Sequence, residues 1–138
     1  MKIYEIIALQ NTIKKLSRLN FNSTKKSYEA YKILKTYNDS MVFFTNEIEK
    51  IKLNIDGFTT NKDGSFNIPK EKQEEFNQKL NEFCSEEFEL IKEKIDLNME
   101  DIFEAGQAVD DKYKINAEDF DCLEKLFQEI RRKGNKNG

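Results

Sequence analysis

The residue types that could carry chemistry in this 138-residue chain are carboxylates, two cysteines and a loop rich in side-chain oxygens. The chain has no histidine, and so lacks the commonest general base and metal ligand. Its carboxylates cluster along the second half: Glu86, Glu87, Glu89, Asp110, Asp111, Asp119 and Asp121. Carboxylates act as acid–base pairs when their surroundings push their pKa values apart. Nothing in the sequence places two of them in one cleft, so we predict that the chain is not an enzyme.

The two cysteines, Cys84 and Cys122, have neither C-x-x-C spacing nor a histidine partner that would favour redox or nucleophilic work. Both lie in apolar patterns, which favours two reduced, buried thiols in a reducing compartment. No stretch approaches the ~20 apolar residues of a membrane span. We expect a cytoplasmic protein that does not contact the membrane.

The oxygen-rich loop is a candidate calcium site that lacks two strong ligands. Part of the EF-hand pattern is matched in residues 59–70 by Asn61, Asp63, Gly64 and Asn67. The first and twelfth positions, which need a carboxylate and a bidentate glutamate, hold Thr59 and Lys70. We therefore predict no bound metal and no cofactor. The alternating pattern around Asp63-Gly64 predicts a β-hairpin over residues 58–68.

The rest of the chain is organised around a long helix predicted for residues 24–55. Its apolar residues repeat every three or four positions: Ala30, Leu34, Tyr37, Met41, Phe44, Ile48, Ile51 and Ile55. Such a 3.5-residue repeat is typical of a coiled-coil seam, which packs against another helix. Asn22 or Ser23 is expected to cap its first turn.

Apolar spacing predicts further helices over residues 4–18, 70–84 and 117–133. Asn116 and Asp119 form a box-like cap for the last helix. We expect this helix to bury Phe120, Leu123, Leu126, Phe127 and Ile130, and to end at Gly134. The predicted fold is therefore mainly α (α+β). It is a single domain over residues 1–133, in which a long helical hairpin carries a small β-hairpin near its tip and the C-terminal helix packs back on it. Residues 134–138 are expected to be a disordered tail.

Two segments leave alternatives open. The spacing of Cys84, Phe88, Ile91 and Ile95 would extend the 70–84 helix to residue 97, whereas the alternation in residues 88–90 is typical of a strand. If the helix continues, it matches the length of the long helix and a monomer can bury the seam. If residues 87–95 form a strand, part of the seam stays uncovered. Residues 98–114 are weakly periodic, with three predicted anchors: Met99, Ile102 and Phe103.

Candidate partner-binding residues are aromatic and acidic. Tyr37 and Phe44 belong to the seam, whereas Tyr28, Tyr31 and Phe43 lie off it and would either widen the core or form a partner-binding patch. Four aspartates complete the set of candidates: Asp110, Asp111, Asp119 and Asp121.

The charge is unevenly distributed along the chain. Residues 1–55 hold ten basic and five acidic residues, a net of +5, whereas residues 56–138 hold thirteen and twenty-one, a net of −8. Opposite halves attract when they fold together or when one copy meets another, which favours self-association or an obligate partner. Neither half has the focused basic stripe of a nucleic-acid binder.

Four segments in order also resemble a family of small phage and prophage proteins from low-GC Gram-positive bacteria, a domain of unknown function. The matching segments are residues 25–35, residues 63–68 leading into Phe76, residues 87–95 and residues 115–126. The family pattern is strand-like at residues 87–95. The resemblance implies a location among phage structural genes and no catalytic residues. From this resemblance we expect a protein-binding accessory factor of virion or tail assembly, in the cytoplasm of a bacterial host cell or associated with the virion. The alternative is an inhibitor of a host anti-phage defence system (anti-CRISPR-like or another anti-defence protein) whose acidic half imitates nucleic acid.

Overall fold

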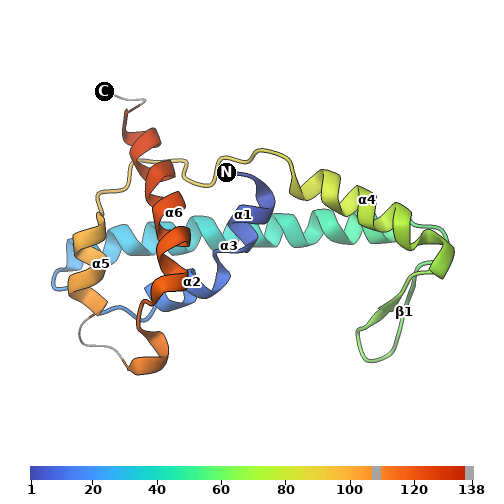
Figure 1. Ribbon diagram of the computed structural model, residues 1–138, viewed down its shortest axis with the longest axis horizontal. Helices are drawn as coiled ribbons and strands as arrows, with labels where there is room; N and C mark the ends of the chain where they lie inside the picture. The colour runs from blue at the N-terminus through green and yellow to red at the C-terminus, as the bar shows by residue number, and fades with distance from the viewer. Residues whose placement is uncertain (107–109, 136–138) are drawn as a thin grey trace.

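The computed structural model describes residues 1–106 and 110–135 as a mainly helical structure built on one long helix, α3 (Thr24–Leu53). Figure 1 shows two regions along this helix. The head gathers the two ends of the chain around the N-terminal half of α3. The arm consists of the C-terminal half of α3, the antiparallel helix α4 (Gln73–Cys84) and a small hairpin at the far end. The predicted fold class, mainly α with a small sheet, is confirmed.

The first predicted helix is two helices, α1 (Ile3–Ile7) and α2 (Gln10–Leu16). The amide of Leu9 bonds to the carbonyl of Ile6 at 3.0 Å, a tight i→i−3 turn that changes the chain direction between the two helices. The turn keeps Leu9 in the core with the apolar residues on either side of it.

Helix α3 begins after Ser23, whose Oγ accepts a hydrogen bond from the amide of Lys26 at 3.2 Å, as the capping pattern predicts. Its buried stripe differs from the predicted seam. The buried apolar positions include Ala30, Ile33, Tyr37 and Phe44, and Ser40 is buried between them. Leu34, Met41 and Ile48 are only half-buried.

The arm ends in the predicted hairpin, which pairs β1 (Thr59–Thr60) with β2 (Phe66–Asn67) in antiparallel register. Gly64 has a φ of +89° in the turn, a conformation that L side chains rarely adopt. Gly57 also has a positive φ, and a Cβ there would lie 2.6 Å from Cγ of Pro69. A 3₁₀ turn, η1 (Lys70–Lys72), then leads into α4.

The region after α4 settles the alternatives left open for residues 86–97. Helix α4 ends at Cys84. Residues 85–98, here called the extended segment, begin with a turn at Ser85 and Glu86 and form neither a helix nor a strand, with one isolated bridge between Lys2 and Glu87. The amide of Ile3 bonds to the carbonyl of Glu86 at 3.0 Å, and the amide of Phe88 bonds to the carbonyl of Met1 at 2.8 Å. A continuous helix through residue 97 is therefore wrong. Residues 86–88 pair instead with residues 1–3, a contact across more than 80 positions that local spacing does not encode.

The extended segment also explains the shifted stripe of α3. Leu90, Ile91, Ile95 and Leu97 are all buried. Thr36 Oγ1 donates to the carbonyl of Leu90 at 2.8 Å. Chain that is extended rather than helical therefore covers α3 in the head, and the buried face includes positions outside a strict two-helix seam.

Two helices complete the head: α5 (Met99–Gly106) and α6 (Ala117–Asn135), with a short 3₁₀ turn, η2 (Asp111–Tyr113), before α6. Helix α5 was not predicted, although Asn98 and Asp101 form a reciprocal cap, each side chain accepting from the other's amide at 3.0 Å. Helix α6 passes through Gly134 and ends at Asn135. The predicted tail therefore begins within the helix, and residues 136–138 lie outside the described chain.

Candidate protein-binding site

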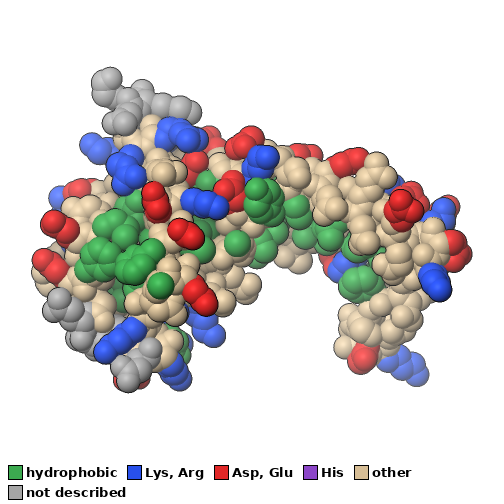
Figure 2. Space-filling model, in the orientation of Figure 1, with side chains coloured by type: hydrophobic (Ala, Val, Ile, Leu, Met, Phe, Trp, Pro, Cys, Tyr) green, Lys and Arg blue, Asp and Glu red, His purple; other side chains and the backbone are tan. Residues whose placement is uncertain are grey.

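Two exposed phenylalanines lie next to each other on the head. Phe103 on α5 and Phe120 on α6 are 44% and 45% exposed, and their ring centroids are 5.9 Å apart in an edge-on arrangement. Figure 2 shows hydrophobic side chains gathered on this face of the head, with acidic side chains around them. Both residues were expected in the core, Phe103 as an anchor and Phe120 on the buried face of α6, and both expectations are wrong.

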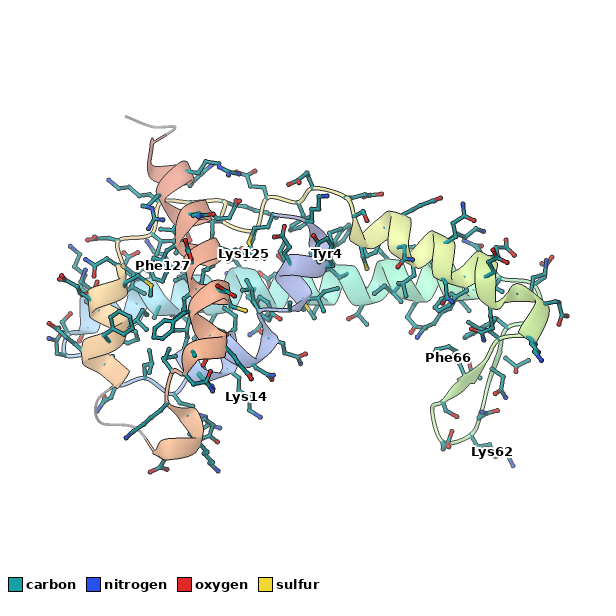
Figure 3. All side chains as sticks on the ribbon, viewed as in Figure 1. Tyr4, Lys14, Lys62, Phe66, Lys125 and Phe127 are labelled. Carbon is teal, nitrogen blue, oxygen red and sulfur yellow. The ribbon has the colours of Figure 1, made fainter. Side chains whose placement is uncertain are left out.

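The start of α6 explains why Phe120 is exposed. Leu123, Leu126 and Phe127 point into the core, and Phe127 lies between α6 and α5 (Figure 3). At 100° per residue, Phe120 lies at one edge of this stripe, whereas Asp119 lies within it. The core-facing position in the first turn is therefore taken by Asp119, and Phe120 is turned outward.

Carboxylates surround the phenylalanine pair. Glu100 and Glu124 each lie one helical turn from a phenylalanine, while Glu104 and Asp121 are sequence neighbours of the pair, and all four are exposed. Within the part of the chain that the structure describes, none of the four is held in an ion pair. We call this surface the acidic aromatic patch: Phe103, Phe120, Glu100, Glu104, Asp121 and Glu124. Residues 98–124 carry nine acidic and two basic residues, a net charge of −7.

Asp119 serves the fold instead of a partner. It is 4% exposed, and its carboxylate accepts from Thr12 Oγ1 at 2.8 Å, from Lys15 Nζ at 2.6 Å and from the Asn116 amide at 2.9 Å. Burial acts to raise the pKa of Asp119, but these hydrogen bonds outweigh it and hold the pKa below its usual value. Asp119 closes the predicted cap of α6 and ties α6 to α2, so its assignment as a partner-binding residue is wrong.

Two of the other three acidic candidates are exposed. Asp110 and Asp121 are exposed, and Asp121 belongs to the acidic aromatic patch. The side chain of Asp111 lies outside what the structure describes.

A second exposed aromatic pair lies on α3. Tyr28 and Tyr31 are 57% and 54% exposed and stack with their centroids 6.1 Å apart, and Lys32 Nζ lies 5.2 Å from the centroid of the Tyr28 ring. Lys25 lies one turn before Tyr28, and Lys35 one turn after Tyr31. We call this surface the basic aromatic patch: Tyr28, Tyr31, Lys25, Lys32 and Lys35. These two tyrosines therefore do not widen the core.

Phe43, the third aromatic candidate, lies apart from both patches. Its ring is 46% exposed and stacks on Phe88 of the extended segment with centroids 6.0 Å apart. It lines a groove of about 520 Å³ between α3 and the extended segment, together with Thr36 and Lys92.

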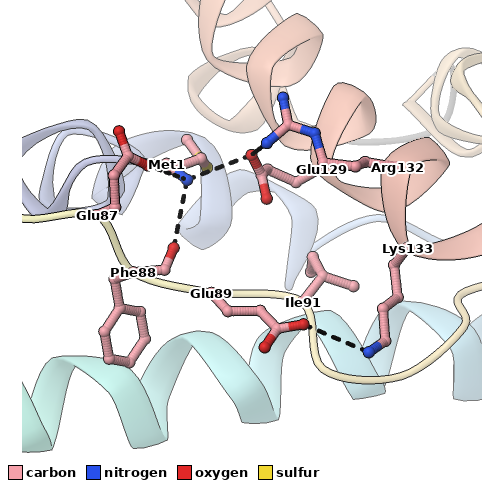
Figure 4. A pocket seen from close by; sticks show the side chains of 8 residues that line it. All are labelled: Met1, Glu87, Phe88, Glu89, Ile91, Glu129, Arg132 and Lys133. Atoms are coloured by element: carbon pink, nitrogen blue, oxygen red, sulfur yellow. Dashed lines mark hydrogen bonds and ion pairs between the residues drawn. The ribbon is translucent and has the colours of Figure 1, made fainter. Parts of the chain in front are cut away.

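A smaller hollow of about 270 Å³ lies where the N-terminus, the extended segment and α6 meet (Figure 4). Its charged groups pair with one another. The amine of Met1 lies 3.2 Å from Glu129 Oε1 and 3.4 Å from Glu87 Oε2, and Lys133 Nζ lies 3.3 Å from Glu89 Oε1. These pairs connect three segments, so we assign the hollow a structural role.

Covalent chemistry was considered for Cys84, and metal binding for Asp63. Burial raises the pKa of the Cys84 thiol, which lowers its thiolate fraction. The carboxylate of Asp63 accepts from the amide and the hydroxyl of Ser65 at 3.0 and 2.6 Å, so it stabilises the hairpin turn. Across residues 1–106 and 110–135, no group of three or more His, Cys, Asp or Glu side chains is placed to hold a metal ion.

The comparisons with family models, curated proteins and solved structures found no match for this chain. Within the described residues, no helix has both the length and the apolar character needed to cross a membrane.

Proposed function

We propose that this chain is a non-enzymatic protein-binding module of a phage or prophage, accessory to virion or tail assembly. The observation that carries the proposal is the acidic aromatic patch, an exposed phenylalanine pair amid carboxylates that form no ion pair with a described residue. The resemblance to phage and prophage proteins supplies the biological context.

The chemistry of the patch specifies the kind of partner. Aromatic side chains are enriched at protein interfaces and supply much of the binding energy when they enter a pocket. The surrounding carboxylates favour a basic surface, and they accelerate its approach more than they add to the final affinity. We expect the partner to offer an apolar pocket or side chain with lysines or arginines around it.

The test is affinity capture of the tagged chain from phage-infected cells, with the captured proteins identified by mass spectrometry. Wild type should retain a virion or tail protein, and the variant Phe103→Ser/Phe120→Ser should lose it. Leu53→Ser is the matched control because Leu53 is also exposed, at 68%, but lies on the arm. Equal capture by wild type and the double variant would show that this patch is not the binding surface.

The acidity of the patch also favours a second candidate function, inhibition of a host anti-phage defence system. In that case the carboxylates would occupy a basic nucleic-acid site on a host effector. Capture would then retain a host nuclease or another nucleic-acid-binding effector instead of a virion protein, and added nucleic acid would release it.

A further inference from the structure

We propose that the acidic aromatic patch of one copy binds the basic aromatic patch of a second copy, so that the chain self-associates head to tail. The inference rests on the proposed function, because it uses the same acidic surface. It goes further by naming one partner of that surface, a second copy of this chain, and the residues on both sides of the contact.

The two patches match in form and are opposite in charge. Each is built on an exposed aromatic pair, with centroids 6.1 Å apart for Tyr28–Tyr31 and 5.9 Å apart for Phe103–Phe120. The basic aromatic patch holds three lysines, and the acidic aromatic patch holds four carboxylates. Tyrosine packed against phenylalanine would bury aromatic surface, while the lysines and carboxylates around the rings would set the orientation.

Three of the charged groups nearest the rings are available for such a contact. Lys35, Glu100 and Glu124 form no ion pair with any residue that the structure describes. Lys32 is bound to Glu29 at 3.2 Å and lies over the ring of Tyr28, which holds its ammonium group at the aromatic surface. Lys25 is paired with Asp96 at 3.1 Å, so we expect it to contribute less to the contact between the two patches.

The position of the patches determines the kind of assembly. Tyr28 lies nine residues before the buried Tyr37, a rotation of half a turn at about 100° per residue, and so faces away from the core on the outer side of α3. The acidic aromatic patch lies on different elements, α5 and α6. A contact between unlike patches is heterologous and leaves one patch free on each copy of a pair, so further copies can add as a ring or an open chain.

The first measurement is light scattering of the full chain over a range of concentrations at low and high salt. The average mass of wild type should rise above that of one chain with concentration, and it should fall back as salt screens the exposed charges. Wild type that keeps the mass of one chain at every concentration in low salt would overturn the inference.

A mixing experiment tests the pairing of unlike patches. Lys32→Glu/Lys35→Glu keeps only the acidic patch, and Glu100→Lys/Glu124→Lys keeps only the basic patch. Each variant alone should have the mass of one chain. An equimolar mixture should associate to at least twice this mass, because the intact patches, and also the two reversed patches, are then opposite in charge. Failure of the mixture to pair, when circular dichroism shows both variants folded, would overturn the inference.

Charge reversals away from the patches serve as controls. Lys62 lies at the tip of the hairpin, far from the head (Figure 3), and Glu74 is exposed on α4. The variants Lys62→Glu and Glu74→Lys should associate as wild type does. Loss of association in these controls would show that net charge, not patch pairing, drives assembly.

The outcomes also separate this inference from the proposed function. A monomeric wild type that still captures a virion protein through Phe103 and Phe120 would overturn only the self-association. A wild type that associates as described but captures no protein in infected cells would overturn only the accessory role in assembly.

Discussion

The head and the arm share one helix but are stabilised differently. In the head, α3 lies against α2 and the extended segment, and nearly all of the buried core belongs to this region. In the arm, α3 lies against α4, and Lys52 Nζ lies 4.0 Å from the centroid of the Phe66 ring in the hairpin. Within residues 45–84, all of which the structure describes, Ile55 and Phe76 are the only buried apolar residues.

This difference in packing predicts a difference in stability between the two halves of α3. Hydrophobic stabilisation is proportional to the apolar area removed from water, so the many-sided head should be much more stable than the two-layered arm. Both aromatic patches lie on the head, where a stable core holds them in place. The arm holds its hairpin far from the head with a smaller core.

Phe44 lies where the two regions meet, so its removal should have the largest effect. Its ring is buried and contacts Phe83 of α4 and Phe88 of the extended segment, with centroids 6.1 and 4.8 Å away. Phe44→Ala should lower the free energy of unfolding by about 3–5 kcal/mol, the usual loss for an emptied aromatic core site. Urea denaturation measures this change. A decrease in the free energy of unfolding below ~1 kcal/mol would mean that packing around Phe44 does not stabilise the junction between head and arm.

Asp119 tests whether polar contacts also stabilise the head. Asp119→Ala removes the acceptor of three hydrogen bonds and should lower the free energy of unfolding by about 2–3 kcal/mol at neutral pH. Asp121 lies two residues further along α6 and is exposed, so Asp121→Ala is the matched control and should have little effect.

The pKa of Asp119 gives a separate test by pH. Because its pKa is lower in the folded state than in the unfolded chain, its contribution is complete above the unfolded value of about 3.9 and is lost as pH falls through the folded value. Below about pH 4, wild type should therefore lose stability more steeply than Asp119→Asn. Parallel curves for the two proteins would contradict this origin of acid sensitivity.

Phe76 tests whether the arm can open by itself. It packs in an aromatic row with Phe66 and Phe58, whose successive centroids are 6.4 and 5.8 Å apart. Phe76→Ala should cost about 2 kcal/mol and should reduce amide-exchange protection in α4 while the head keeps its protection. Equal loss of protection in the head would show that the two regions unfold as one unit.

Tyr37 should give the smallest effect, and one of opposite sign. Its hydroxyl is buried in the head without a hydrogen-bond partner among the described residues, and burial raises its pKa. Tyr37→Phe should therefore raise the free energy of unfolding by about 1 kcal/mol, because a buried polar group without a partner is destabilising. A loss of stability in thermal denaturation would show that the hydroxyl is bonded in solution.

The sequence predicted most of the elements that depend on local chemistry. The long helix after Ser23, the hairpin around Gly64 and the cap formed by Asn116 and Asp119 all follow from neighbours within a few residues. The missed helix α5 had a similar signal, since Asn98 and Asp101 form the same kind of cap three residues apart. It was missed because the apolar periodicity that follows is short.

The candidate site could be predicted only in part. The sequence correctly separated Tyr28 and Tyr31 from the seam of α3, because their helical phase differs from that of Tyr37. It did not identify the phenylalanine pair, because Phe103 and Phe120 come from different helices and fall near the apolar stripe of each. Which edge of such a stripe is covered depends on the neighbouring helix, and no local pattern contains that information.

The sequence by itself determined the helical class, the caps and turns, the absence of histidine chemistry and the contrast of charge between the two halves. Tertiary structure decided that residues 85–98 are extended, because they pair with residues 1–3 and cover α3. It also decided that Asp119 is buried while Phe120 is exposed, because Thr12 and Lys15 of α2 supply the partners that a buried carboxylate requires. The burial of the extended segment and of Asp119 depends on which segments meet in space. The contacts that decide it join residues more than 80 positions apart in the sequence.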